Sequence, residues 1–100
     1  MKGADLVVDI LQQQGVEFVS TLCGNGTDPL YTALCKKGVR VVDCRNEQAA
    51  AYLADAYARL TGRLSVCIVS SGIAHINALA GVANAWYDGA PMLLITGEGP

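Results

Sequence analysis

The stretch SVCIVSS at residues 65–71 is a run of apolar and small residues without a charged side chain. A strand with one face in water would alternate apolar and polar residues, whereas a continuous run predicts a strand covered on both faces. PMLLIT at residues 91–96 is a second run of this kind, and a helical segment over residues 74–87 separates the two. Residues 65–96 therefore predict a strand, a crossover helix and a parallel strand.

The rest of the chain continues this alternation. Apolar, β-branched runs predict two more strands, over residues 18–22 and 39–44. Apolar residues at helical spacing predict three more helices, over residues 4–14, 29–37 and 47–61. The predicted fold class is α/β, with three layers (α/β/α) and a parallel sheet of about four strands in one domain, residues 1–100.

Local signals mark the ends of two of these helices. Asp28 is a predicted cap, with Pro29 opening the helix behind it, and Asn46 is a predicted cap of the following helix. Gly62 lies just past the end of that helix, where glycine commonly terminates a helix.

The composition excludes several classes of protein. Hydrophobic residues make up 52% of the chain and charged residues 16%, which excludes intrinsic disorder. The net charge is −2 and the 7 basic residues are scattered, so no nucleic-acid partner is expected. The apolar run over residues 91–95 is far shorter than the ~20 residues of a membrane helix, so no membrane partner is expected.

The four cysteines form no C-x-x-C pair, and three of them lie inside or beside apolar runs. They are expected to be reduced thiols that pack as small apolar side chains, and the N-terminus lacks a signal-peptide pattern. Together these features predict a cytoplasmic location. The chain has a single histidine, so no metal site is expected within it. The cysteines are Cys23, Cys35, Cys44 and Cys67.

The sequence given ends directly after the strand predicted at residues 91–96, without a following helix. A strand of the buried type without its covering helix leaves apolar surface and an unpaired edge in water. The domain is therefore expected to be incomplete at its C-terminal end, with the missing part supplied by a longer chain or a partner.

Ligands of open parallel sheets bind beyond the carboxyl ends of the strands. At the first strand end, the loop starting at Cys23-Gly24-Asn25 is no G-x-G-x-x-G dinucleotide motif, because Pro29 stands at its last glycine position. Gly24 is then either a plain turn residue or a point where the backbone approaches a flat ligand closely.

At the third strand end, Ser70 and Ser71 lack the G-x-S-x-G context of a catalytic nucleophile. They are interpreted as turn residues whose hydroxyls bond backbone groups. His75 is interpreted as a surface or capping residue near the start of the next helix.

Glu47 is the strongest candidate for chemistry. It occupies the first turn of a predicted helix, where a carboxylate can simply stabilise the helix dipole. The small apolar residues Ala49, Ala50 and Ala51 follow it, so partial desolvation is expected. Desolvation raises the pKa of a carboxyl group, as proton transfer requires. On position alone, dipole stabilisation and proton transfer both stay open.

The helix over residues 47–61 contains six alanines. Small side chains allow either the close approach of another helix or tight packing on the chain's own sheet, and both interpretations stay open. Asp55 and Arg59 stand four residues apart and are expected to form an exposed helical pair.

Three segments in order carry a resemblance to a known family. Residues 45–62, RNEQAAAYLADAYARLTG, resemble the R-H-E-Q-A-A-x-x-A-x-G-Y-A-R-x-T-G segment in the pyrimidine-binding N-terminal domain of thiamine diphosphate-dependent enzymes, particularly the acetolactate synthase-like group. That group continues with S-G-P-G-x-x-N, for which this chain has Ser71-Gly72 and Asn77, and with P-M-L-x-I-T-G, which matches residues 91–97. Residues 21–24, TLCG, are similar to a variant in acetolactate synthase-like and 2-hydroxyacyl-CoA lyase-like members.

The resemblance covers essentially the whole chain and implies a truncated thiamine diphosphate-binding fold, Rossmann-like or flavodoxin-like. It also implies that Glu47 is the catalytic glutamate, which hydrogen-bonds N1′ of the cofactor's aminopyrimidine ring and exchanges a proton with it. The other matching residues would bind the cofactor: Cys23, Gly24, Asn25, Gly72 and Asn77.

The same resemblance implies an enzyme that makes or breaks a C–C bond next to a carbonyl, on a 2-oxo acid or a 2-hydroxyacyl substrate. Family members hold Mg²⁺ and the diphosphate on a second domain with a G-D-G…N motif, which is missing here because Tyr87 precedes Asp88-Gly89. The fragment is therefore expected to be inactive alone. A homodimer or homotetramer through the alanine-rich helix is implied, and FAD in the parent enzyme is compatible with the family.

Two positions depart from the family pattern. Asn46 replaces the usual histidine, and Gly72-Ile73-Ala74 replaces Gly-Pro-Gly, with His75 next to it. Bulk in this turn would crowd the cofactor pocket or reshape its substrate side. Two alternatives therefore stay open: a non-catalytic binding or regulatory module that keeps the fold, and a flavodoxin-like binder of a nucleotide or flavin.

Overall fold

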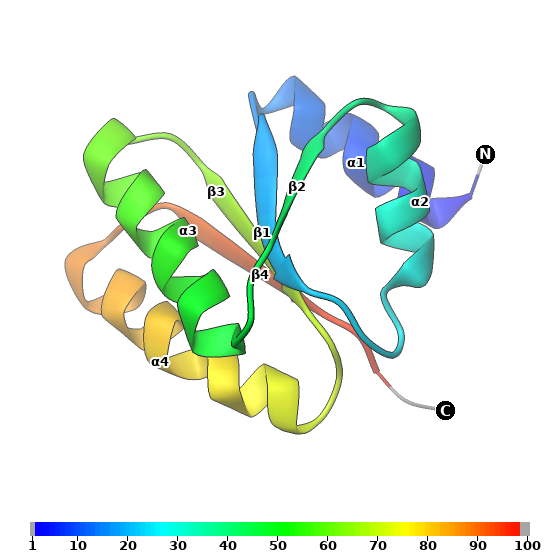
Figure 1. Cartoon of the computed structure of the whole chain (residues 1–100). Coiled ribbons are helices and arrows are strands. Elements are labelled where there is room, and N and C mark those ends of the chain that lie inside the picture. The colour runs from blue at the N-terminus through cyan, green and yellow to red at the C-terminus, as the bar shows by residue number, and fades with distance from the viewer. Residues whose placement is uncertain (1, 99–100) are drawn as a thin grey trace.

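The computed structural model describes residues 2–98, so Met1, Gly99 and Pro100 lie outside the described residues. Its helices and strands alternate: α1 (Gly3–Gln13), β1 (Phe18–Leu22), α2 (Asp28–Lys36), β2 (Arg40–Asp43), α3 (Glu47–Thr61), β3 (Ser65–Val69), α4 (Ile73–Asp88) and β4 (Met92–Thr96). The strands form one parallel sheet in the order β2-β1-β3-β4. Helices α1 and α2 cover one face, and α3 and α4 the other (Figure 1). The predicted three-layer α/β/α fold is confirmed.

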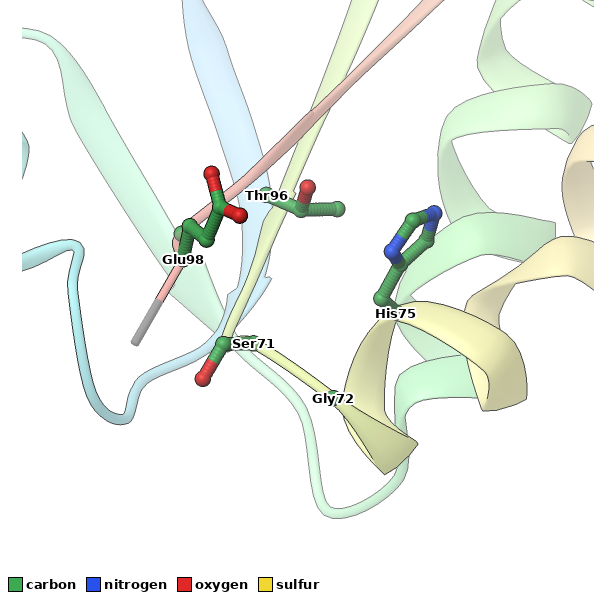
Figure 2. A pocket seen from close by; sticks show the side chains of 6 residues that line it. Ser71, Gly72, His75, Thr96 and Glu98 are labelled. Atoms are coloured by element: carbon green, nitrogen blue, oxygen red, sulfur yellow. The ribbon is translucent and has the colours of Figure 1, made fainter. Parts of the chain in front are cut away.

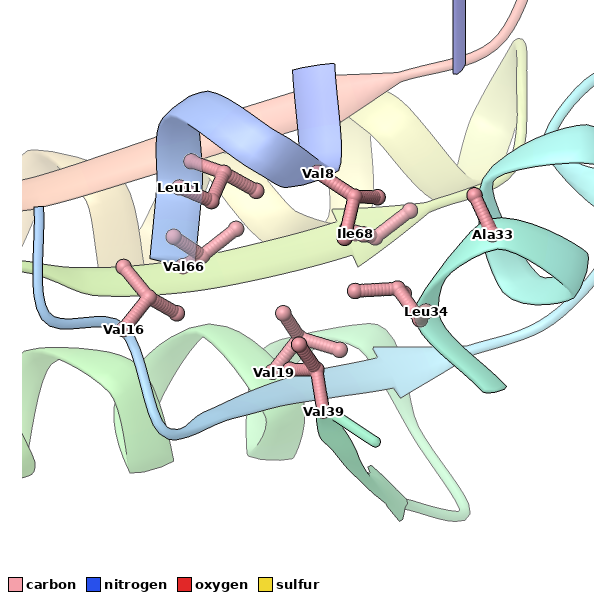
Figure 3. Packing of buried hydrophobic residues seen from close by; sticks show 9 residues of the cluster. All are labelled: Val8, Leu11, Val16, Val19, Ala33, Leu34, Val39, Val66 and Ile68. Carbon is pink, nitrogen blue, oxygen red and sulfur yellow. The ribbon is translucent and has the colours of Figure 1, made fainter. Parts of the chain in front are cut away.

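Strand β3 shows why its sequence is a continuous apolar run. All five of its residues are buried. Val66 and Ile68 pack in the core beneath α1 and α2, which Figure 3 shows, whereas Cys67 and Val69 pack in the core beneath α3 and α4. Successive side chains of a strand point to opposite faces, so a strand between two helical layers has buried, uncharged side chains on both faces.

Small residues let α3 and α4 approach closely on their face of the sheet. Ala50, Ala51 and Ala54 of α3 and Ala78 of α4 are fully buried. A Cβ atom added to Gly81 of α4 would lie 2.5 Å from Cβ of Ala51, so only glycine fits there. The close helix contact expected of the alanine-rich helix is thus made with α4 of the same chain.

Helix α3 begins and ends as predicted. The Asn46 side chain accepts a hydrogen bond from the Gln48 backbone N–H at 2.7 Å, so it caps the helix. Gly62 ends the helix with a left-handed φ of 70°, which glycine adopts without steric cost.

Several predicted element ends differ from the structure by one or two residues, and two of these differences have a local cause. The residue before α2 is Thr27, and Asp28 is already the first helical residue; the buried Thr27 hydroxyl donates to the Gly24 carbonyl at 3.1 Å and so orders the preceding loop. Strand β3 ends at Val69, two residues earlier than predicted, because Ser70 leaves the ladder and donates its hydroxyl to the Asn25 carbonyl at 3.2 Å.

The expectation that Asp55 and Arg59 form an exposed pair is wrong. Asp55 is only 3% exposed, because it faces α4. Its carboxylate accepts hydrogen bonds from Arg59 Nε at 2.9 Å and from Asn84 Nδ2 on α4 at 2.6 Å. Arg59 also donates to Asp88 at 2.5 Å, and the hydrogen bonds to Asp88 and Asp55 raise the pKa of its guanidinium. The pair is therefore part of an α3–α4 connection.

The cysteines differ in their surroundings. Cys67 is buried, and desolvation raises the pKa of its thiol to about 11, so it behaves as a small apolar side chain. Cys23 and Cys35 are exposed, so the expectation that the cysteines pack as small apolar side chains is wrong for these two.

Strand β4 lies at one edge of the sheet, and its Leu93 is 41% exposed.

Among the described residues, no helix has the length and apolar character needed to cross a bilayer.

Candidate functional site

The carboxyl ends of the four parallel strands meet at one edge of the sheet, together with the first turns of α3 and α4. A pocket of about 570 Å³ opens there between the β3–α4 turn and the end of β4 (Figure 2). His75, on the first turn of α4, and Glu98, after β4, stand on opposite sides of it. The residues that line the pocket are Ser71, Gly72, His75, Thr96, Gly97 and Glu98.

Of the predicted site residues, Gly72 lies at this pocket. It directly precedes α4, with a positive φ of 68°, and nothing lies within 4 Å of the position that a Cβ would take. Glycine is therefore required there by its backbone conformation and not by crowding.

The loop after β1, which contains Cys23, Gly24 and Asn25, packs against the ends of β3 and β4. A Cβ on Gly24 would lie 2.7 Å from the side chain of Ser70, and a Cβ on Gly97 would lie 2.8 Å from the carbonyl oxygen of Asn25. The close approach of Ser70 is thus sufficient to require glycine at position 24. The Ser70 hydrogen bond to Asn25 confirms the interpretation of this serine as a turn residue that bonds backbone.

Glu47 lies at the first position of α3 and is half-buried. Its Oε1 atom accepts a hydrogen bond from Nδ2 of Asn77, on α4, at 2.8 Å. Within residues 2–98, its Oε2 atom has no hydrogen-bond partner and the carboxylate has no ion-pair partner. The carboxyl group therefore has one oxygen held by the protein and one oxygen left for another group.

Asn77 connects the start of α3 to α4 through three contacts. Besides bonding Glu47, its Nδ2 lies 3.4 Å from Oδ1 of Asn46, and its Oδ1 accepts a hydrogen bond from Nε2 of Gln48 at 3.0 Å. We refer to Asn46, Glu47, Gln48 and Asn77 as the Asn77 cluster. The sequence interpretation assigned no role to the Gln48 side chain, because its contact with Asn77 depends on how α3 and α4 are paired.

The predicted site residues thus fall into separate groups at one edge of the sheet. Glu47 and Asn77 are in direct contact, whereas Cys23, Gly24 and Asn25 belong to the neighbouring β1 loop. In the described part of the chain, no hydrogen bond joins the β1 loop to the Asn77 cluster.

Neither group is built as a metal centre. No cluster of three or more histidine, cysteine, aspartate or glutamate side chains among residues 2–98 is arranged to hold a metal ion.

Comparison with known proteins gives consistent matches along the chain. This chain is 44% identical over 98 residues to "Acetolactate synthase isozyme 2 large subunit" of Escherichia coli (strain K12). The match covers 98% of this chain and 18% of that relative. "Probable acetolactate synthase large subunit" of Methanocaldococcus jannaschii is 36% identical over 100 residues, 100% of this chain and 17% of the relative. "2-hydroxyacyl-CoA lyase 2" of Mus musculus is 43% identical over 95 residues, 95% of this chain and 15% of the relative.

The chain thus spans less than a fifth of the length of these relatives. The sequence model of a family described as "Thiamine pyrophosphate enzyme, N-terminal TPP binding domain" matches residues 1–100. The match covers every element of the sheet and both groups of site residues, and so the chain belongs to the thiamine pyrophosphate enzyme family, as its N-terminal TPP-binding domain.

Proposed function

We propose that this domain is the pyrimidine-binding part of an enzyme that makes or breaks a C–C bond next to a carbonyl group. The names of the relatives, acetolactate synthase and 2-hydroxyacyl-CoA lyase, support a 2-oxo acid or 2-hydroxyacyl substrate. The single observation that carries the proposal is the geometry of Glu47: a half-buried carboxyl with one oxygen fixed by Asn77 and the other oxygen free of protein partners.

The carboxyl group of Glu47 suits the hydrogen-bonding atoms of the cofactor of this family. Thiamine diphosphate, when bound, supplies a nucleophilic carbon for carbonyl chemistry, and its aminopyrimidine ring offers N1′ as a hydrogen-bonding atom. Glu47 would hold a proton at N1′, through the oxygen that Asn77 does not bond, and would exchange it during the reaction. Glu47 is half-buried at the start of α3, so part of its side chain is shielded from water.

The other predicted residues would shape the space around the ring. Gly72 leaves its side of the pocket open, because no side chain projects from it. The β1 loop of Cys23, Gly24 and Asn25, which packs against Ser70 and Gly97, would lie beside the ring. His75 and Glu98, which flank the pocket, would lie toward the substrate.

The remaining parts of the proposed enzyme lie outside this domain. We place Mg²⁺ and the diphosphate group on a second domain, since residues 2–98 hold no acidic cluster for a metal ion. The same proposal includes FAD in the parent enzyme, a cytoplasmic location and a homodimer or homotetramer. This domain alone would then lack turnover.

Substitution of Glu47 by glutamine in the native protein tests the proposal. Glutamine keeps an oxygen for Asn77 but cannot exchange a proton, so we expect turnover to fall by about 100-fold or more, the range of general acid–base catalysis. The affinity for thiamine diphosphate with Mg²⁺, measured by isothermal titration calorimetry, should change by less than about tenfold, since one neutral hydrogen bond to N1′ is retained. Unchanged turnover would remove Glu47 from the chemistry.

A non-catalytic binding or regulatory module is the second candidate function. It is favoured by His75, which lines the pocket at a position where smaller or hydroxylated residues are common in the family pattern. For such a module, calorimetry would show binding of thiamine diphosphate, while the native protein would turn over no 2-oxo acid or 2-hydroxyacyl substrate.

A further inference from the structure

The hydrogen bonds of the Asn77 cluster determine which way the side-chain amide of Asn77 is oriented. The backbone N–H of Gln48 can only donate, and it lies 2.7 Å from Oδ1 of Asn46, so this side-chain oxygen faces the cluster. An amide oxygen can only accept, and the atom of Asn77 that approaches it must therefore be the amide nitrogen Nδ2. The helix cap thus sets the orientation of Asn77.

Gln48 supports the same orientation from the other side. With Nδ2 of Asn77 turned toward Asn46 and Glu47, its Oδ1 faces outward and accepts from Nε2 of Gln48 at 3.0 Å. If the Asn77 amide turned over, its oxygen would face two other acceptors, Oδ1 of Asn46 and Oε1 of Glu47. A half-buried contact between Oδ1 of Asn77 and Oε1 of Glu47 without a proton is unfavourable, so the cluster prefers one arrangement.

This arrangement distinguishes the two oxygens of Glu47. A donor on Oε1 stabilises negative charge on that atom and disfavours a proton there. Within residues 2–98, Oε2 has no such donor. The exchangeable proton of the carboxyl group is therefore directed to Oε2, the oxygen that Asn77 does not bond.

We propose that Asn77 is a positioning residue that acts through Glu47, selecting Oε2 as the proton-carrying oxygen, and that Asn46 and Gln48 set the direction of its amide. The inference rests on the proposed function of Glu47 and changes the role of Asn77, which was predicted to bind the cofactor. It also gives a role to Asn46, which replaces the histidine of the family pattern.

The test is Gln48→Glu in the native protein, because Gln48 is exposed and its substitution leaves the core intact. A glutamate would place an acceptor against Oδ1 of Asn77 and favour the reversed amide. Ala49→Glu is the matched control: it adds the same charge to the same exposed turn of α3, at a residue outside the cluster. A second variant, Asn77→Asp, replaces the donor to Glu47 by an acceptor.

The decisive readout is the rate at which bound thiamine diphosphate exchanges its C2 proton for deuterium, measured by quenched-flow NMR at saturating cofactor. We expect Gln48→Glu and Asn77→Asp to slow this exchange by about tenfold or more, and Ala49→Glu by less than about twofold. The dissociation constant of the cofactor, measured by calorimetry on the cofactor-free protein, should change by less than about threefold for Gln48→Glu, because Gln48 has no contact with the ligand in this scheme.

Different experimental results would overturn the positioning role of Asn77 and the proposed role of Glu47. If Glu47→Gln slows the exchange but Gln48→Glu does not, or if Ala49→Glu slows it equally, the positioning role is overturned while the role of Glu47 stands. If Glu47→Gln exchanges the C2 proton at the rate of the unmodified protein, the proposed function itself is overturned.

Discussion

Asp55 shows how a single side chain connects two helices on the face of the sheet that carries Glu47. It lies on α3 and is 3% exposed, with hydrogen bonds from Arg59 on its own helix and from Asn84 on α4. The Asn77 cluster connects the same helices nearer their N-termini. Hydrogen bonds near the N-termini of α3 and α4 and farther along both helices therefore help to hold the two helices against each other.

We predict that Asp55→Ala destabilises the protein by about 1.5–3 kcal/mol, because it removes hydrogen bonds to a charged acceptor that is buried. Thermal or urea denaturation of the native protein measures the loss. Glu17→Gln is the control, since the Glu17–Arg63 pair is exposed, with 68% of the Glu17 side chain and 56% of the Arg63 side chain accessible, and its loss should leave no measurable change. Equal effects of both substitutions would contradict a special role for Asp55.

At the scale of elements, the pairing of α3 with α4 depends on Gly81. Alanine normally favours a helix over glycine by about 1 kcal/mol, so a helical glycine needs a packing reason. Here the reason is steric, because a Cβ on Gly81 would lie 2.5 Å from Cβ of Ala51 and 2.7 Å from its backbone carbon. Neither neighbour is the flexible end of a side chain, so one helix must move.

Gly81→Ala is therefore predicted to destabilise the protein by about 1–3 kcal/mol, opposite in sign to the usual effect in a helix. Gly3→Ala, at the start of α1 with nothing within 4 Å of the added Cβ, is the matched control and should be neutral or slightly stabilising. Denaturation midpoints of the two variants give the comparison. A stabilised Gly81→Ala protein would show that α3 and α4 are packed less closely than described.

A substitution at Gly81 should also change the geometry of the functional site. Glu47 receives its hydrogen bond across the α3–α4 contact, so a shift of α4 lengthens the distance from Asn77 Nδ2 to Glu47 Oε1. The element that carries the catalytic candidate is thus positioned by a contact between small residues, Ala51 and Gly81, rather than by polar groups alone.

At the scale of the whole molecule, helices α3 and α4 carry several exposed large apolar side chains. Large apolar side chains there are exposed by 38% to 86%. Exposed apolar side chains on two neighbouring helices are candidates for an interaction site, which supports the proposed homo-oligomer. The residues are Tyr52, Leu53 and Leu60 on α3, and Ile73, Ile76, Leu79, Trp86 and Tyr87 on α4.

We predict that Leu79→Glu shifts the native protein to a smaller species, because it places a charge within this apolar surface. The control is Ile10→Glu on α1, at the opposite face of the sheet, where a residue of similar exposure, 48% against 43%, is replaced. Analytical ultracentrifugation gives the mass of each variant. Dissociation by Ile10→Glu and not by Leu79→Glu would place the interface on α1 instead.

Much of the fold could be predicted from the sequence, because its signals are local. The run at residues 65–71 predicted a strand buried on both faces, and Asn46 and Gly62 marked both ends of α3 correctly. Glu47 could be singled out from the residues around it, and its contact with Asn77 joins two separate segments that carry the family resemblance. Its role as an acid remains a prediction.

The sequence by itself determined the order of helices and strands, the layers and the family, since hydrophobic periodicity, caps and motifs act over a few residues at a time. Only the tertiary structure decided that Asp55 is buried, that Cys23 is exposed and that Gln48 reaches Asn77. Gln48 and Asn77 are 29 residues apart, and so are Asp55 and Asn84. Contacts at such separations depend on how two helices pack on the sheet, which no local pattern encodes.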